Sequence, residues 1–164
     1  MKTYLGLAAA AAASILSLGA AHAQEDVVGV ADPEALFTSP DPKLNTNKQA
    51  AYHIEKELLE CGEWSRAAEW LTPAYHQHNP QAKSGRDGVV FFFTQVRKVE
   101  PKPCPAKMST KVAAVIAEGD YVTVITPRVM KDPKDPAKTY ATSWFDTWRF
   151  VDGKADEHWD PATR

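Results

Sequence analysis

The chain has 164 residues, a formal net charge of −2 at pH 7 and a hydrophobic content of 44%. This length and composition are typical of one domain with enough residues to bury a core, and the near-neutral charge gives no basic footprint for nucleic acid. The sequence contains none of the glycine-rich loops that bind dinucleotides or phosphates, no Gly-x-Ser-x-Gly elbow, and too few cysteines for a four-thiolate metal site.

Residues 1–23 have the pattern of a secretory signal peptide. Lys2 supplies the positive charge, an Ala-rich apolar run extends from Leu5 to Leu18, and Ala21-His22-Ala23 is a small-x-small cleavage site. A membrane anchor is the alternative, but the apolar run is shorter than a spanning helix requires. We therefore predict cleavage after Ala23, a secreted or periplasmic protein, and no membrane association after cleavage.

Residues 24–44 are rich in proline and lack apolar periodicity, which predicts an extended lead-in to a domain over 45–164. A helix is predicted to begin near Asn45 or Thr46. Its buried face is marked by apolar residues at helical spacing, namely Ala51, Ile54, Leu58 and Cys61. Gly62 then predicts the helix stop. A second short helix is predicted over 64–71, and an extended piece over 75–80 ends in Asn79-Pro80.

A third helix is predicted after Ser84. The run Val89–Phe93 alone would fit a buried strand, but Ser84 with Asp87 resembles a helix-start box. Apolar residues also recur at helical spacing at Val89, Phe92, Phe93 and Val96. Two strands are predicted next, over 110–117 and 121–130. Helices first and strands last are the pattern of an α+β domain.

The segment 144–160 is predicted to be the closing hairpin. Asp152-Gly153 separates two runs rich in aromatic and β-branched residues, which is a strong signal for a two-residue turn. Such a turn pairs Val151 with Lys154, Arg149 with Asp156, and Thr147 with His158. Because side chains alternate along a strand, His158 and Asp160 point to the same face.

Three segments resemble motifs of SnoaL-like proteins, the polyketide-cyclase branch of the NTF2-like superfamily. The motif residues are Phe145-Asp146, Arg149, Gly153-Lys154 and Glu157-His158-Trp159-Asp160, preceded by Tyr75–Pro80 and Glu118–Val122. The family usually shows an apolar residue after Gly-Lys, where this chain has Ala155. The resemblance covers about 45–160 and favours the helix after Ser84. It implies an α+β fold, the NTF2-like cone, in which a curved antiparallel sheet wraps around N-terminal helices and a mostly apolar pocket opens at the mouth.

The resemblance also implies a cofactor-independent enzyme that removes a proton α to a carbonyl, as in aldol, cyclase or isomerase chemistry. We assign Asp160 as the general base and His158 as its partner, because an apolar cavity raises a carboxylate pKa and a histidine can handle the second proton. The other predicted site residues are His78, also catalytic, and the substrate contacts Asn79, Arg149, Asp146, Tyr75 and Trp148. Asp146 is expected to orient Arg149 or a neighbour. Export argues against aromatic polyketides as the substrate, since their cyclisation is cytoplasmic.

Two other readings stay open. The chain fits a secreted, non-catalytic module that binds a small ligand or a partner, and relatives on this scaffold imply a homodimer. A metal site built from His76, His78, His158 and Asp160 is a weaker alternative, and we predict neither a metal nor a cofactor.

Cys61 and Cys104 are the two cysteines of the chain. Export places them in an oxidising compartment, where paired thiols persist as disulfides. Both also fall at the ends of predicted elements, where they can approach each other without disrupting a helix or a sheet. Two unconnected, buried thiols are the alternative. We predict a structural disulfide without a part in catalysis.

Overall fold

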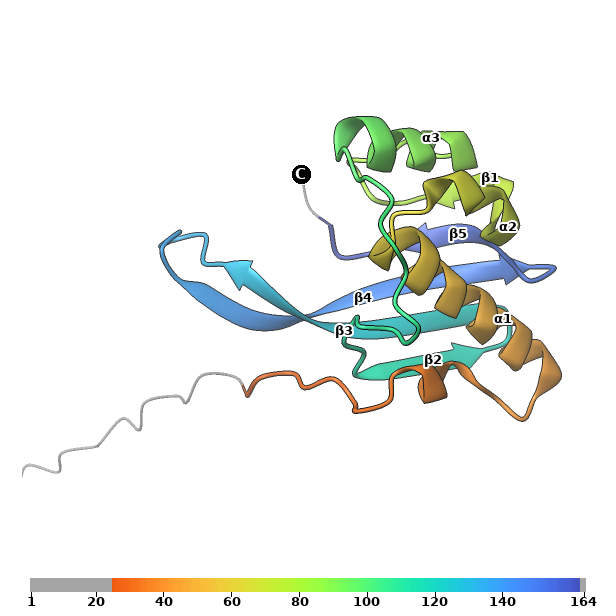
Figure 1. The fold of residues 1–164 in the computed structure, drawn as a ribbon, viewed down its shortest axis with the longest axis horizontal. Helices are drawn as coiled ribbons and strands as arrows, with labels where there is room; N and C mark the ends of the chain where they lie inside the picture. The colour runs from red at the N-terminus through yellow and green to blue at the C-terminus, as the bar shows by residue number, and fades with distance from the viewer. Residues whose placement is uncertain (1–24, 163–164) are drawn as a thin grey trace, which may run out of the picture.

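The computed structural model describes residues 25–162, in which helices cover one face of a five-stranded sheet (Figure 1). The predicted signal peptide and its cleavage site lie outside the described residues. In chain order the elements are α1 (Pro42–His53), α2 (Ala67–Trp70), β1 (Leu71–Gln77), α3 (Arg86–Phe91), β2 (Ala114–Glu118), β3 (Tyr121–Lys131), β4 (Thr139–Val151) and β5 (Lys154–Trp159). Within the described part of the chain, each helix is too short or too polar to cross a membrane.

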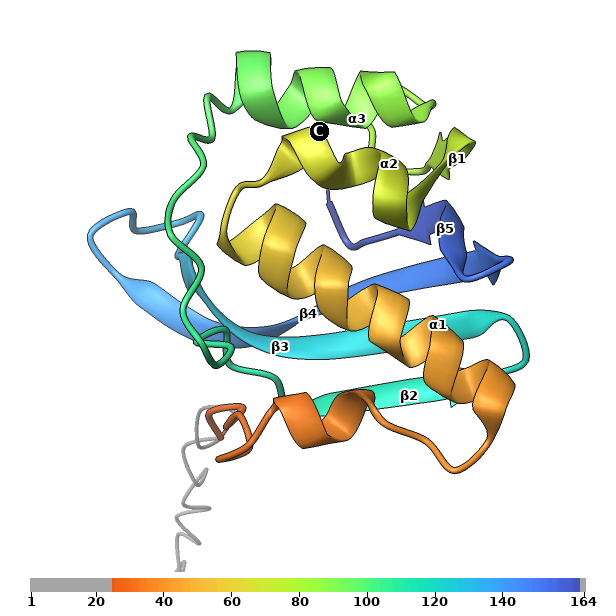
Figure 2. The same cartoon turned by 45° about the vertical axis from the view of Figure 1, so that its right-hand side comes forward.

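Helix α1 begins at Pro42, earlier than the predicted start at Asn45 or Thr46. The Asp41 side chain accepts a hydrogen bond from the Leu44 N–H at 2.9 Å, and Pro42 fits the first helical turn because its N–H is not needed there. The helix continues through a π-helical segment, Ile54–Glu60, and stops before Gly62, whose φ is +76°. This confirms the predicted stop. Figure 2 shows α1 crossing the concave face of the sheet.

The segment predicted as an extended lead-in contains ordered structure. Glu34–Phe37 form a turn of 3₁₀ helix, and the Phe37 side chain is completely buried. The Glu34 carboxylate accepts hydrogen bonds from Lys56 Nζ at 3.1 Å and from the Met108 N–H at 2.8 Å. These contacts attach the segment to α1 and to the chain before β2, so Phe37 contributes to the same core.

The sheet is mixed, whereas the prediction was an antiparallel sheet. The strand order is β1-β5-β4-β3-β2, and β1 runs parallel to β5, with Leu71 opposite Ala155 and Gln77 opposite His158. The other three neighbouring pairs are antiparallel. Strand β1 follows α2 directly and begins at Leu71, the residue predicted to end the second helix. It therefore brings its polar side chains beside those of the last strand.

The closing hairpin forms as predicted at its turn and differs in its register. Asp152 and Gly153 both have positive φ, at 48° and 73°, and Val151 pairs with Lys154. An irregularity follows, after which Arg149 pairs with Glu157, and Trp148 with His158. The predicted partners, Asp156 for Arg149 and His158 for Thr147, are therefore wrong by one residue. The extra residue re-aims the end of β5, as β-bulges do.

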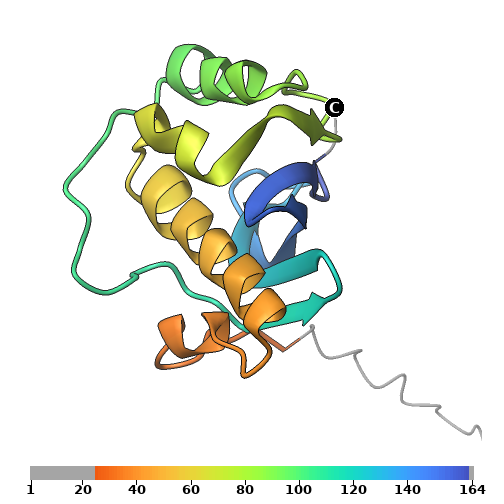
Figure 3. The same ribbon diagram turned by 90° about the vertical axis from the view of Figure 1, so that its right-hand side faces the viewer.

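The core lies between α1 and the concave face of the sheet. It is formed by residues with relative exposure of 4% or less, including Phe37, Ala51, Ile54, Leu58, Leu71, Val122, Val124 and Trp148. The long segment after α3 runs outside the helices to β2 (Figure 3). It carries Cys104, which is bridged to Cys61 with a Cα–Cα separation of 5.3 Å. The predicted disulfide is confirmed.

Candidate functional site

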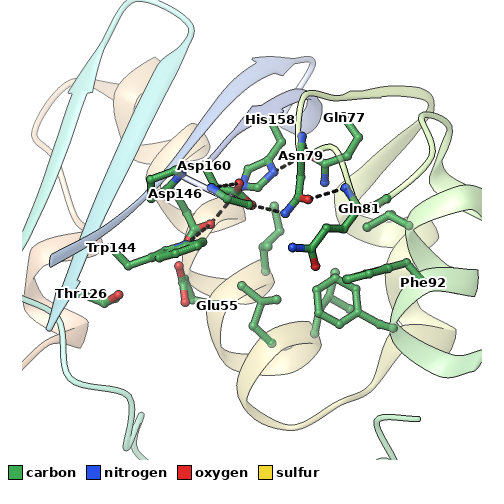
Figure 4. A pocket seen from close by; sticks show the side chains of 18 of the residues that line it. Glu55, Gln77, Asn79, Gln81, Phe92, Thr126, Trp144, Asp146, His158 and Asp160 are labelled. Carbon is green, nitrogen blue, oxygen red and sulfur yellow. Dashed lines mark hydrogen bonds and ion pairs between the residues drawn. The ribbon is translucent and has the colours of Figure 1, made fainter. Parts of the chain in front are cut away.

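A cavity of about 730 Å³ lies between the helices and the concave face of the sheet. Its apolar wall comes mainly from the continuation of α1 and from α3 with the π-helical segment that follows it, Phe92–Val96. The side chains are those of Ile54, Leu58, Val89, Phe92 and Phe93. The opposite wall comes from the strands and carries the polar groups (Figure 4). A volume of this size fits a small organic ligand, and an apolar cavity with a few convergent polar groups is the usual form of such a site.

His158 is the central polar group of the strand wall. Its Nε2 lies 3.0 Å from Asp146 Oδ1, and its Nδ1 lies 2.9 Å from Gln77 Oε1. Both neighbours present acceptor oxygens, so each ring nitrogen of His158 lies at hydrogen-bond distance from a side chain that holds the ring in place. His158 and Asp146 are only 6% and 8% exposed. The two side chains thus form a nearly dry hydrogen-bonded pair, and the His158 ring is held on both of its nitrogen atoms.

Asp160 lies beside this pair, just after the end of β5. Its Oδ2 accepts a hydrogen bond from Asn79 Nδ2 at 2.8 Å, and its Oδ1 accepts one from the Ala162 N–H at 2.9 Å. One ligand atom from each of Asp146, His158 and Asp160 can be chosen so that all three lie within 4.8 Å of one another. Two carboxylates and a histidine therefore converge on one part of the cavity, as Figure 4 shows.

Aromatic side chains frame the polar group. Trp148 Nε1 donates to Tyr75 Oη at 3.3 Å, and both rings lie near the His158 ring. Burial raises the pKa of Tyr75 well above its ordinary value, so its hydroxyl stays protonated and can donate. Trp144 Nε1 donates to Asp146 at 3.3 Å, while the Arg128 guanidinium stacks on the Trp144 ring at 3.9 Å.

Glu55 faces this group from the helix side of the cavity. The residue is 4% exposed, and its Oε1 is buried without a hydrogen-bond partner among the described residues. Burial raises the pKa of Glu55 well above its ordinary value, and the negative charge of Asp146 adds to the effect. The sequence prediction missed Glu55. The available signal was its position four residues after Ala51, on the apolar face of the helix.

Six of the eight predicted site residues line the cavity, namely Asp160, His158, Asn79, Asp146, Tyr75 and Trp148. His78 and Arg149 do not, because strand alternation points them to the outer face of the sheet. There Glu157 accepts from His78 Nε2 at 2.8 Å and from Arg149 Nε at 2.9 Å. Those hydrogen bonds lower the pKa of Glu157. Asp146, which was expected to orient Arg149 or a neighbour, contacts His158.

Gln77 is a second cavity residue that the sequence prediction missed. His76 on β1 and His78 just after it point to the same side, as their spacing predicted, but both are exposed and lie beside Glu157 on the outer face of the sheet. The residues between and beside them, Tyr75, Gln77 and Asn79, point into the cavity. The same alternation places His76 and His78 on the face of the sheet opposite to His158 and Asp160. The four residues considered as metal ligands therefore do not come together. Asp146, His158 and Asp160 are the described group with metal-ligand spacing.

The chain matches the model of the SnoaL-like domain over residues 50–158. Among solved structures it resembles a candidate SnoaL-like polyketide cyclase from Jannaschia sp. CCS1, with 17% identity, a TM-score of 0.54, and coverage of 76% of this chain and 91% of that one. A candidate polyketide cyclase from Acidithiobacillus ferrooxidans has 17% identity, a TM-score of 0.51, and coverage of 75% and 89%.

An NTF2-like protein of unknown function from Burkholderia pseudomallei has 19% identity, a TM-score of 0.50, and coverage of 72% of this chain and 91% of that one. At such identities these likenesses establish the fold alone. No curated protein matches the chain in sequence.

Proposed function

Because the chain belongs to the SnoaL-like family, we propose that it binds a small, largely apolar carbonyl compound in its cavity and catalyses proton transfer at the carbon beside the carbonyl. The observation that carries this proposal is the buried His158–Asp146 pair with Asp160 next to it, opposite the apolar side chains that the helices contribute to the cavity. An aldol, cyclase or isomerase reaction would use the same first step.

Asp160 is the proposed general base. Its carboxylate removes the α-proton, and the electron pair of the broken C–H bond forms the enolate, whose charge moves to the carbonyl oxygen. His158 is the proposed acid: when the substrate binds, the His158 Nδ1–H exchanges its contact with Gln77 Oε1 for a hydrogen bond to the enolate oxygen, to which it can pass a proton. Asp146 fixes the orientation of the His158 ring through Nε2, and Asn79 fixes the orientation of Asp160. Both groups are side chains, so this step needs no cofactor.

Proton exchange tests the proposal directly. A panel of uncharged aryl methyl ketones and cyclic 1,3-diketones is incubated with the protein in D₂O, and loss of the α-proton signal is followed by NMR. We expect exchange with wild type, a loss of about 10²–10⁴-fold in Asp160→Asn, and normal exchange in Glu157→Gln. Glu157 is the matched control, since it lies on the same segment and points outward.

The second candidate function is a non-catalytic binding or interaction module, and an observation on the outer face favours it. Ile116, Tyr121 and Phe145 expose 58%, 47% and 44% of their surface on adjacent strands. Such apolar residues are suited to a homodimer contact. Ketone binding without any exchange would favour this function. Sedimentation of wild type and Phe145→Lys would test the dimer.

We also propose that the protein is exported and cleaved after Ala23. The Cys61–Cys104 bridge supports this, because such bridges persist in oxidising compartments. Mass spectrometry of the protein isolated from its own cells would test it, with a mature chain beginning at Gln24 as the expected result.

A further inference from the structure

Glu55 stands apart from the other acidic residues of its helix. Glu60 accepts hydrogen bonds from Ser109 and Thr110, which outweigh the effect of burial and lower its pKa. Glu57 pairs with His53 at 2.8 Å and with Arg66 at 2.8 Å. Glu55 is the most enclosed of the three, yet its Oε1 finds no partner within residues 25–162.

The surroundings of Glu55 favour its neutral form. Desolvation is the first cause of its raised pKa, and the charges of Asp146 on β4 and Glu60 on its own helix act in the same direction. The Arg128 guanidinium on β3 opposes them in part. A neutral carboxylic acid carries one O–H donor. In that form Glu55 is a buried hydrogen-bond donor, and its carboxyl group lines the cavity.

A purely structural role does not account for this residue. Leaving a buried polar group unpaired costs stability, and an apolar side chain of similar shape is often neutral or stabilising at such a position. The neighbours Ile54 and Leu58 show that the helix readily supplies apolar residues to this wall. A carboxyl group retained at a cost to stability points to a partner that occupies the cavity.

We propose that Glu55 is a ligand-binding residue, which donates a hydrogen bond from its neutral carboxyl group to an uncharged acceptor oxygen of the ligand. This inference deepens the proposed function, on which it rests for the class of ligand. The nearby carboxylates, Asp146 and Asp160, accept but cannot donate, and they repel anions. The cavity therefore selects a ketone or alcohol oxygen over a carboxylate at the Glu55 side.

Two naphthalenes of nearly equal shape test the proposal. 2-Acetylnaphthalene carries the acceptor oxygen and 2-ethylnaphthalene lacks it, so the ratio of their dissociation constants isolates recognition of that oxygen. We expect wild type to prefer the ketone by about tenfold. Glu55→Gln, which keeps a neutral donor, should retain the preference. Glu55→Leu should lose it while binding 2-ethylnaphthalene as wild type does.

Two further measurements separate recognition from folding. Urea unfolding should show Glu55→Leu to be at least as stable as wild type, since it removes an unpaired polar group. Should Glu55→Leu fail to fold, infrared spectra still decide: wild type at pH 7 should show the band of a protonated carboxylic acid, which Glu55→Gln lacks.

The inference is overturned if the ketone preference survives in Glu55→Leu, if wild type binds both compounds equally or neither, or if the infrared band is missing. Failure of the proposed catalysis looks different, because the ketone preference would then stand without any exchange of α-protons in D₂O.

Discussion

His158 and Asp146 meet on the concave face of the last hairpin, with His158 Nε2 3.0 Å from Asp146 Oδ1. His158 lies opposite Trp148, so Asp146, two residues before Trp148 on β4, is its diagonal neighbour. The bulge that follows the turn produces this arrangement. Without it, His158 would lie opposite Thr147 and point outward with the Thr147 side chain, away from the cavity.

A double-mutant cycle should find strong coupling between these two residues. Removing one partner of a buried hydrogen-bonded pair leaves the other unsatisfied, so Asp146→Asn and His158→Gln should each lower the free energy of unfolding by about 1–3 kcal/mol. The double variant should lose less than the sum, with a coupling energy of about 1–3 kcal/mol. Urea unfolding measures all four proteins. Additive losses would show that the pair is not energetically linked.

The free energy of unfolding should depend on pH in a way that reveals the raised pKa of Glu55. The folded-state pKa of Glu55 lies well above the ordinary value of 4.5. The free energy of unfolding that Glu55 contributes through protonation is therefore fully present below pH 4.5 and declines as pH rises toward the folded pKa. The difference in free energy of unfolding between wild type and Glu55→Gln should therefore fall with pH above 4.5, by up to about 1.4 kcal/mol per unit.

Glu60→Gln is the matched control for this pH dependence. The folded-state pKa of Glu60 is lowered by its hydrogen bonds, so its stabilisation is present above pH 4.5 and is lost as pH falls through the lowered pKa. Its difference curve should thus slope in the opposite direction and at lower pH. Parallel curves for the two variants, measured by urea unfolding from pH 3 to 8, would contradict the assignment of Glu55.

Local patterns predicted the elements better than the faces that their side chains take. The apolar spacing of α1, the Gly62 stop and the Asp152-Gly153 turn are decided by short-range chemistry, and all three are as predicted. The site depends on which side chains of each strand face the cavity, and side chains alternate between the two faces. One extra residue in β5 and the parallel placement of β1 decide which side chains face the cavity, and neither feature has a clear local signal.

The same argument explains Glu55 and Arg149. A glutamate on an apolar helix face looks like an ordinary interruption of the pattern until the structure shows that its Oε1 has no hydrogen-bond partner among residues 25–162. Arg149 lies within the motif segment, but it is an odd number of residues from Asp146 and therefore points to the other face of the sheet. Motif membership alone could not distinguish these cases.

Substitutions on the outer face should leave ligand binding unchanged. His78→Ala and Arg149→Met remove partners of Glu157 that lie on the side of the sheet away from the cavity. We expect the dissociation constant of 2-acetylnaphthalene to change less than about twofold in each, because neither side chain lines the cavity. Asn79→Ala removes the hydrogen bond that orients the Asp160 carboxylate and should instead slow the exchange of ketone α-protons in D₂O. A large loss of ketone binding in Arg149→Met would show that Arg149 contributes to the ligand site.

Removing the Cys61–Cys104 bridge should destabilise the fold without changing the site. The two cysteines are 43 residues apart in sequence, and closing a loop of this length restricts the unfolded chain by about 4 kcal/mol in the chain-entropy model. The double variant Cys61→Ala/Cys104→Ala, compared with wild type by urea unfolding, should lose about that amount. Wild type with its disulfide reduced is the control and should match the variant. Ketone binding should persist at 25 °C in both, because neither cysteine lines the cavity. Equal stability of the oxidised and reduced proteins would contradict the structural role of the bridge.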